Sequence, residues 1–146
     1  MVDYEQLYDQ NDKLTELTNF LTLLLSDRAV CDSQITCDLF FRYIEQVKAR
    51  LVTTDSALYS ELLATSDQRS RNLANRFMGG SREINRIFST YTKKWCKMST
   101  RQLYIKRYDE FMAETEEMFQ MVLDRLQDET EHLYPALRRA AAEKVA

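Results

Sequence analysis

His132 is the only imidazole in the chain, and it follows Glu129 by three residues. A Glu-x-x-His pair on a helix can supply half of a two-metal carboxylate site, but a second such pair on another helix is needed to complete it. The sequence contains no second pair. Imidazole-rich iron sites need several histidines, and nucleophilic catalysis needs a base beside Ser or Cys, for which no motif is present. We therefore predict no metal, no cofactor and no enzymatic activity, with His132 a structural or surface residue.

Three cysteines, Cys31, Cys37 and Cys96, are the other candidates for metal or redox chemistry. Their number is odd, no two have CxxC spacing, and no group of histidines accompanies them. Neither a disulfide framework nor a zinc site is indicated. We expect reduced, structural thiols, because free cysteines are among the most buried residues of proteins.

Long amphipathic helices are the elements that must position these side chains, because only two Gly and one Pro occur and the usual punctuation between short strands is missing. A capping box of Asp3 and Gln6 begins the first predicted helix, which extends to about Asp27. Asp32 or Ser33 caps the second. The helical spacing is carried by Leu7, Leu14, Leu17, Leu21, Leu24 and Leu25 in the first helix, and by Phe40, Ile44, Val47, Leu51, Leu58 and Leu62 in the second.

Two further helices are predicted in the second half of the chain. Ser66 or Asp67 opens the third, in which the adjacent Gly79-Gly80 predicts a bend. The fourth follows Ser99 and is interrupted at Pro135, leaving an Ala-rich tail that we expect to form a short extra helix. The apolar faces contain Leu73, Phe77, Ile84, Phe88, Tyr91 and Trp95 in the third helix, and Tyr108, Phe111, Met118, Val122, Leu126 and Leu133 in the fourth.

These patterns predict an all-α fold: an antiparallel up-down four-helix bundle with a short C-terminal extension, in a single domain spanning residues 1–146. The longest apolar run in the first predicted helix, Leu23 to Leu25, is far too short for a membrane span. The first residues show no basic stretch followed by an apolar one. By default we expect a cytoplasmic protein with no membrane partner.

Two segments of the chain have the same spacing of similar residues: Arg50-Leu-Val-Thr-Thr-Asp-Ser-Ala-Leu-Tyr-Ser60 and Arg125-Leu-Gln-Asp-Glu-Thr-Glu-His-Leu-Tyr-Pro135. This is similar to the duplicated H-x-x-x-E...LYP pattern of the hemerythrin-like, or HHE cation-binding, family. Asn11-Asp-Lys-Leu14 and Ser81-Arg-Glu-Ile84 fall where that family's two other histidine signatures are expected. The resemblance covers most of residues 4–137 and implies a hemerythrin-like bundle from a bacterium, with histidines and carboxylates holding two irons.

The sequence departs from that pattern at almost every metal ligand. The positions matched to the family's ligands are Asn11, Arg50, Thr54, Ser81 (or Phe77, one turn earlier), Arg125 and Glu129. Of these side chains only Glu129 is of a ligand type, and arginine is cationic at any working pH and has no lone pair to donate. We therefore predict a degenerate, metal-free member of the family.

Arg50 and Arg125 leave three alternatives open. Both lie on or beside the inward face, so they could form a buried network with carboxylates, most simply Glu129 one turn from Arg125. They could instead extend outward to solvent while apolar groups fill the centre. A third interpretation is a pocket for a phosphate-bearing metabolite, because guanidinium groups match phosphate geometry.

Charge is distributed unevenly along the chain. Residues 69–107 carry 11 basic groups and 1 acidic group, whereas residues 108–135 carry 1 basic and 9 acidic groups. A predicted basic stripe lies opposite the apolar face of the third helix and comprises Arg71, Arg82, Arg86, Lys93 and Lys97. One interpretation is that the basic and acidic helices attract each other and specify the bundle. The other is that the stripe binds an acidic protein; nucleic acid is disfavoured because the chain is acidic overall.

The first functional hypothesis is a non-enzymatic regulatory or protein-interaction module on a metal-free hemerythrin-like scaffold, which binds an acidic partner through the basic stripe. The alternatives are a residual metal or small-molecule anion sensor within the bundle, and a nucleic-acid-associated regulator. Self-association is a further option, through an aromatic patch of Tyr4, Tyr8, Phe41 and Tyr104.

Overall fold

The first two helices begin at caps that the sequence predicts, and the first also ends where it is predicted to end. The computed structural model describes residues 2–51 and 55–145. Helix α1 spans Tyr4–Ser26, and the side chain of Asp3 accepts a hydrogen bond from the backbone N–H of Gln6 at 3.0 Å. Helix α2 spans Gln34–Ala49, and of the two candidate caps it is Ser33 that accepts from a backbone N–H of the first turn.

The predicted second helix corresponds to two helices among the described residues. These are α2 and α3, Asp55–Leu63, and Thr54 lies outside the described residues. Helix α4 spans Gln68–Trp95 with Asp67 as its cap, and it continues as a helix through Gly79-Gly80. The helix is unbroken at the two glycines, and the bend there stays a prediction.

A small antiparallel hairpin follows α4 and was not predicted. Strand β1, Cys96–Lys97, pairs with β2, Gln102–Leu103, with Cys96 opposite Leu103. Arg101, in the connecting turn, has a positive φ of 52°. The residue pattern could not predict this hairpin, because two-residue strands are too short to show an alternating pattern.

The fourth predicted helix is interrupted just before Pro135, and the predicted short extra helix follows the interruption. Helix α5, Tyr108–Asp128, passes into a π-helical turn, Glu129–Leu133, and then into α6, Tyr134–Val145. The backbone N–H of Tyr134 donates to the carbonyl of Glu129, five residues earlier. Proline has no N–H to donate, so this wider turn immediately before Pro135 and the position of Pro135 in the first turn of α6 let the chain stay helical.

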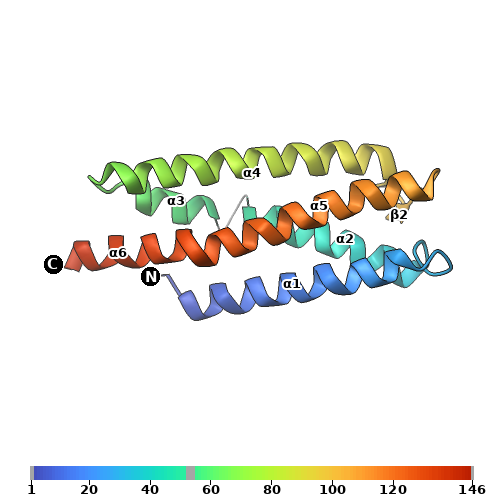
Figure 1. Ribbon diagram of the computed structural model, residues 1–146, viewed down its shortest axis with the longest axis horizontal. Helices are drawn as coiled ribbons and strands as arrows, with labels where there is room; N and C mark the ends of the chain where they lie inside the picture. Colours follow the sequence, from blue (N-terminus) through green and yellow to red (C-terminus); the bar gives the residue numbers. More distant parts are fainter. Residues whose placement is uncertain (1, 52–54, 146) are drawn as a thin grey trace.

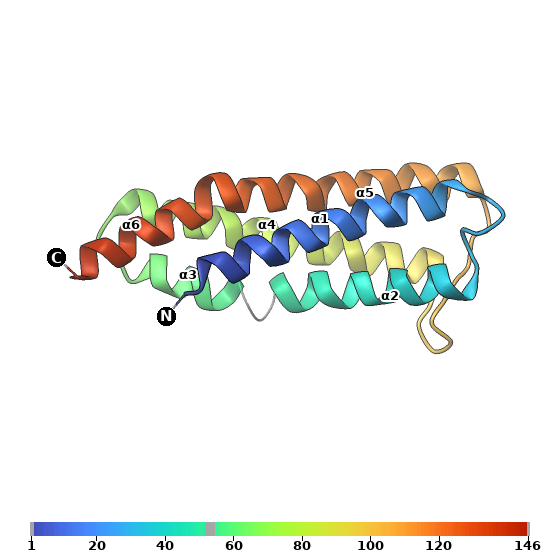
Figure 2. The same ribbon diagram turned by 90° about the horizontal axis from the view of Figure 1, so that it is seen from below.

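The described chain is an elongated all-α bundle in which successive long segments run in alternating directions (Figure 1). Both termini lie at one end of the bundle, and the β1–β2 hairpin lies at the other (Figure 2). Within the described residues, no helix is long and apolar enough to cross a membrane.

Two hydrophobic clusters occupy the length of the bundle. The larger, toward the hairpin, includes Leu21, Phe40, Phe88, Trp95 and Phe111. The smaller, toward the termini, includes Leu7, Leu62, Phe77, Leu133 and Leu137. Phe41, which we placed in an exposed aromatic patch, is 1% exposed in the larger cluster, whereas Tyr104 is 48% exposed. Buried charged side chains lie at the boundary between the two clusters.

Candidate functional site

Four buried charged residues occupy the level between the two hydrophobic clusters. Arg50 caps the C-terminal end of α2, and Asp55 is the first residue of α3. Arg125 lies in the last turn of α5, and Glu129 opens the π-helical turn. The four side chains are between 0% and 8% exposed. Of the alternatives for the two arginines, the structure has the inward one.

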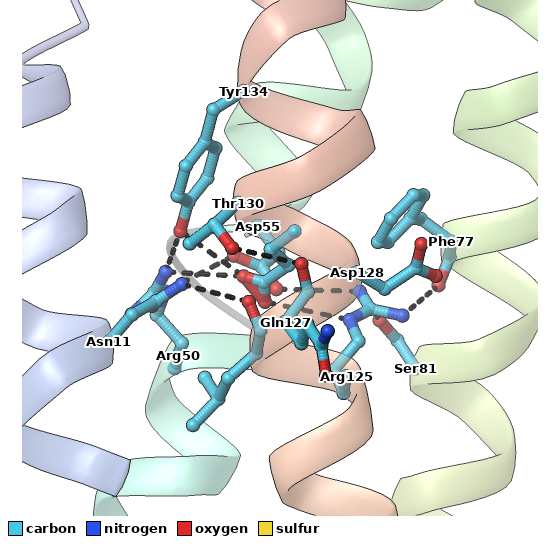
Figure 3. Close-up of polar contacts among 12 residues, drawn as sticks. Asn11, Arg50, Asp55, Phe77, Ser81, Arg125, Gln127, Asp128, Thr130 and Tyr134 are labelled. Carbon is cyan, nitrogen blue, oxygen red and sulfur yellow. Dashed lines mark hydrogen bonds and ion pairs between the residues drawn. The ribbon is translucent and has the colours of Figure 1, made fainter.

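The four side chains form a closed ring of alternating charge, which we call the charge ring (Figure 3). Asp55 contacts both arginines, with Oδ1 3.4 Å from Nε of Arg50 and Oδ2 3.5 Å from Nη2 of Arg125. Glu129 does the same, with Oε2 3.2 Å from Nη2 of Arg50 and Oε1 3.5 Å from Nε of Arg125. Each guanidinium thus has two carboxylate partners, and the ring is neutral when all four groups are ionised.

Two tyrosines from opposite sides complete the ring. Nη2 of Arg50 donates to the hydroxyl of Tyr134, and Nη2 of Arg125 donates to the hydroxyl of Tyr59. In each of the two similar sequence segments, the tyrosine follows the arginine by nine residues. Each arginine thus donates a hydrogen bond to the tyrosine of the other segment. The two similar segments therefore make reciprocal contacts with pseudo-two-fold symmetry. The hydroxyl of Tyr134 also donates to Oε2 of Glu129 at 3.2 Å.

Helix α4 closes the ring on the Arg125 side. The Arg125 guanidinium donates to the carbonyl oxygen of Phe77 at 3.0 Å and to Oγ of Ser81 at 2.9 Å. It also lies over the ring of Phe77, 4.5 Å from the centroid. A Cβ atom on Gly80 would stand 2.9 Å from Nη1 of Arg125, whereas one on Gly79 would meet nothing within 4 Å. Gly80 is thus explained by the close approach of a buried guanidinium.

Helix α1 contributes Asn11, which is 3% exposed and donates from Nδ2 to the carbonyl oxygen of Leu126 at 3.4 Å. Asn11, Arg50, Ser81, Arg125 and Glu129 were all candidates from the sequence, and the structure brings these five to one level of the bundle. Figure 3 shows the first four of them there. The sixth candidate, Thr54, lies outside the described residues.

Sequence reasoning missed Asp55, Tyr59 and Tyr134. Asp55 follows Arg50 by five residues, whereas Glu129 follows Arg125 by four, so aligning the two segments without a gap placed Thr54 where a carboxylate was expected. The two tyrosines belong to the Leu-Tyr pair that both segments share, but no role was assigned to them from the sequence. A search for acidic residues within one position of the expected one would have found Asp55.

Burial controls the protonation of this site. Removal from water, and then the negative charge of Asp55, raise the pKa of Glu129 and the two arginines oppose the increase, with a net pKa of about 7. Burial, then the charge of Asp55, raises the pKa of Tyr59 to about 12. Burial and the charge of Glu129 raise the pKa of Tyr134 well above its ordinary value. Both tyrosines therefore stay protonated at neutral pH, while Glu129 exchanges a proton close to neutrality.

The ring has little room for a ligand. A cavity of about 10 Å³ touches Arg50, Arg125 and Glu129. This is the space of about one water molecule, so a phosphate-bearing metabolite does not fit among the described residues of the ring. Among residues 2–51 and 55–145, no group of three or more His, Cys, Asp or Glu side chains could hold a metal ion.

The other candidates for chemistry lie away from the ring. His132 is 56% exposed, and its Nδ1 is 2.8 Å from a carboxylate oxygen of Asp128. The three cysteines are unpaired; Cys31 and Cys37 are buried and Cys96 is half-buried. Burial raises the pKa of the Cys96 thiol to about 12, so little reactive thiolate forms at neutral pH.

The basic residues of α4 separate into two groups. Arg76 and Lys94 form ion pairs with α5. Arg76 lies 2.8 Å from Asp128, and Lys94 lies 2.6 Å from Glu110 and 2.7 Å from Glu114. These contacts are of the kind expected if the basic and acidic helices attract each other. They do not involve the five residues of the predicted basic stripe.

Within the stripe the five residues differ in their local contacts. Arg71 is half-buried, although its place opposite the apolar face predicts an exposed side chain, and it donates to the carbonyl oxygen of Thr65. Arg86 pairs with Glu83 on its own helix, and Lys97 lies over the ring of Tyr104. The remaining two, Arg82 and Lys93, are exposed and have no ionic partner in the part of the chain that the structure describes.

Comparisons of this chain with protein-family models, with curated proteins and with solved structures found no match.

Proposed function

We propose that the chain is a hemerythrin-like four-helix bundle, of the up-down antiparallel type, in which a charge ring replaces the metal centre. Five of the six positions that the resemblance matches to metal ligands lie at one level of the bundle. In this proposal the matched positions remain at the centre of the bundle, and ion pairs take the place of metal–ligand bonds there. Two guanidinium groups and two carboxylates now join α2, α3 and α5 through ion pairs, the type of connection that a bound cation makes through its ligands.

We further propose a non-enzymatic, regulatory role in a bacterial cytoplasm, in which the basic stripe of α4 binds an acidic protein. The observation that carries this role is the pair of exposed cations, Arg82 and Lys93, which have no counter-charge among the described residues. Arg82, Arg86 and Lys93 follow one another at spacings of 4 and 7 residues, so they lie on one side of α4, whereas Lys97, predicted on the same helix, lies past its end in β1. Exposed positive charge of this kind accelerates and orients association with a negative surface.

A nucleic-acid partner is less favoured by the same geometry. Helix α5 runs beside α4 and carries Glu110, Glu114 and Glu117 toward it. Phosphates that approached α4 from that side would meet this row of carboxylates. A folded acidic protein can instead present its charge to the outer side of α4 alone.

The experiment compares partner capture by two charge-reversed baits. One carries R82E, R86E and K93E; its matched control carries K13E, K106E and R139E, which reverse three exposed cations on other segments. We expect the first bait to lose the acidic proteins that the unchanged chain captures, and the control to keep them. Equal capture by all three baits, with unchanged circular dichroism, would contradict the proposed docking surface.

A further inference from the structure

A groove runs along the outer seam between α4 and α5. Two cavities, of about 540 and 290 Å³, share Met121 and continue one another along this seam. Cross-helix ion pairs close the two ends: Lys94 with Glu114 at one end, and Arg76 with Asp128 at the other. From Arg76 to Lys94 the groove is about 27 Å long at 1.5 Å per helical residue, the length of an 18-residue helix.

The groove has an apolar floor. Ile87 and Met121 are half-buried in it, and the buried side chains of Tyr91 and Met118 lie beneath. Methionine is flexible and polarizable, so a surface of this type can adapt to the apolar side chains of an incoming helix. Gly80 forms part of the α4 wall without any side chain, which widens the second half of the groove.

The two rims of the groove differ in charge. Glu114, Glu117, Asp124 and Asp128 recur at spacings of 3, 7 and 4 residues, so α5 presents a row of carboxylates along its rim. The outer two of these are neutralised by the ion pairs that close the ends. The inner two, Glu117 and Asp124, are exposed and make no ion pair with any described residue. On the α4 rim the nearest cation, Arg86, is already paired with Glu83 at 2.6 Å.

From this arrangement we infer that the α4–α5 groove binds an amphipathic helix of a partner protein, whose apolar face covers Met121 and Ile87 and whose basic flank pairs with Glu117 and Asp124. Apolar residues at i, i+3, i+4 and i+7 would contact the floor, and Lys or Arg one position to the side would reach the α5 rim. Glu117 and Asp124, which make no ion pair with any described residue, favour a positively charged partner helix. Arg86 borders both this groove and the basic stripe, but the two surfaces bind opposite charges, so this inference does not depend on the proposed function.

The test uses two synthetic 18-residue helical peptides with the same apolar face, one with lysines on its flank and one with glutamates, each carrying a fluorescent label. Fluorescence anisotropy measures their binding to the full chain and to three variants. The first variant is E117K/D124K; the second, E116K, reverses the exposed neighbour of Glu117, whose position on α5 is outside the groove lining. M121Q tests the floor at a half-exposed position where little effect on folding is expected.

We expect the lysine peptide to bind the unchanged chain, with an affinity that falls as salt rises from about 0.05 to about 0.3 M. E117K/D124K should weaken this binding by about tenfold and improve binding of the glutamate peptide, whereas E116K should change neither. M121Q should weaken both peptides. No binding of the lysine peptide, or equal losses for E116K and E117K/D124K, would overturn the inference. A chain that is dimeric by light scattering and becomes monomeric in E117K/D124K would also overturn it, because a second copy would then be the occupant.

Discussion

Replacing Arg125 by Ala is the most informative test of the charge ring. The change removes the ion pairs to Asp55 and Glu129 and the hydrogen bonds to Tyr59, to Ser81 and to the Phe77 carbonyl. It leaves two carboxylates, 0% and 1% exposed, with only one guanidinium between them. Removing one partner of a buried ion pair costs roughly 3–5 kcal/mol, and we expect a loss of that size at pH 8.

The cost should depend on pH, because Glu129 can take a proton. Below its pKa of about 7 Glu129 is neutral, so the ring holds one negative charge, on Asp55, which Arg50 alone can balance. At pH 8 both carboxylates are ionised in the parent chain, and the variant must either keep an uncompensated charge or protonate Glu129. The loss of stability in R125A should therefore be larger at pH 8 than at pH 6.

Urea denaturation, followed by circular dichroism and by the fluorescence of the buried Trp95, gives the free energy of unfolding at each pH. The matched control is R76A, because Arg76 is 54% exposed and makes its ion pair with Asp128 at the surface. The control should lose less than about 1 kcal/mol. If R125A lost no more than R76A, or lost equal amounts at pH 6 and pH 8, the charge ring would not contribute to stability as the structure implies.

The remaining predictions concern the carboxylate, the two glycines and metal content. In E129Q the titrating group is removed; in the parent chain folding raises the pKa of Glu129 from 4.5 to about 7, so the folded state binds more protons in that range. The free energy of unfolding of the parent, relative to that of E129Q, should therefore rise by roughly 3 kcal/mol as the pH falls from about 7 to 4.5. Urea denaturation measures both, and parallel pH profiles of the two chains would refute the raised pKa of Glu129. G80A should destabilise the chain, because the added Cβ would displace the Arg125 guanidinium, whereas G79A should stabilise it by up to about 1 kcal/mol; thermal melts that rank the two in the opposite order would show that Gly80 is not needed for Arg125. Freshly purified, untagged protein, before and after anaerobic incubation with ferrous iron, should contain far less than stoichiometric iron by elemental mass spectrometry, and two bound irons per chain would replace the interaction hypothesis with a metal sensor.

The sequence by itself determined most of the helices. The apolar spacing in α1 and α4 and the caps at Asp3, Ser33 and Asp67 are local features, because a cap satisfies backbone N–H groups within three residues of it. The all-α fold follows from the same local signals. Pro135 shows the limit of such reasoning, since the π-helical turn that carries the helix past it was not visible in the residue pattern.

Only the tertiary structure decided where the two arginines point. An arginine on the edge of an apolar face is stable inside only if carboxylates surround it and stable outside if they do not. The partners that settle this are distant in sequence: Arg50 meets Glu129 across 79 residues, and Arg125 meets Asp55 across 70. Local spacing could offer Glu129 to Arg125. The closed ring exists because the ends of α2, α3 and α5 meet at one level between two apolar clusters, where the charges are buried from bulk solvent and must neutralise one another.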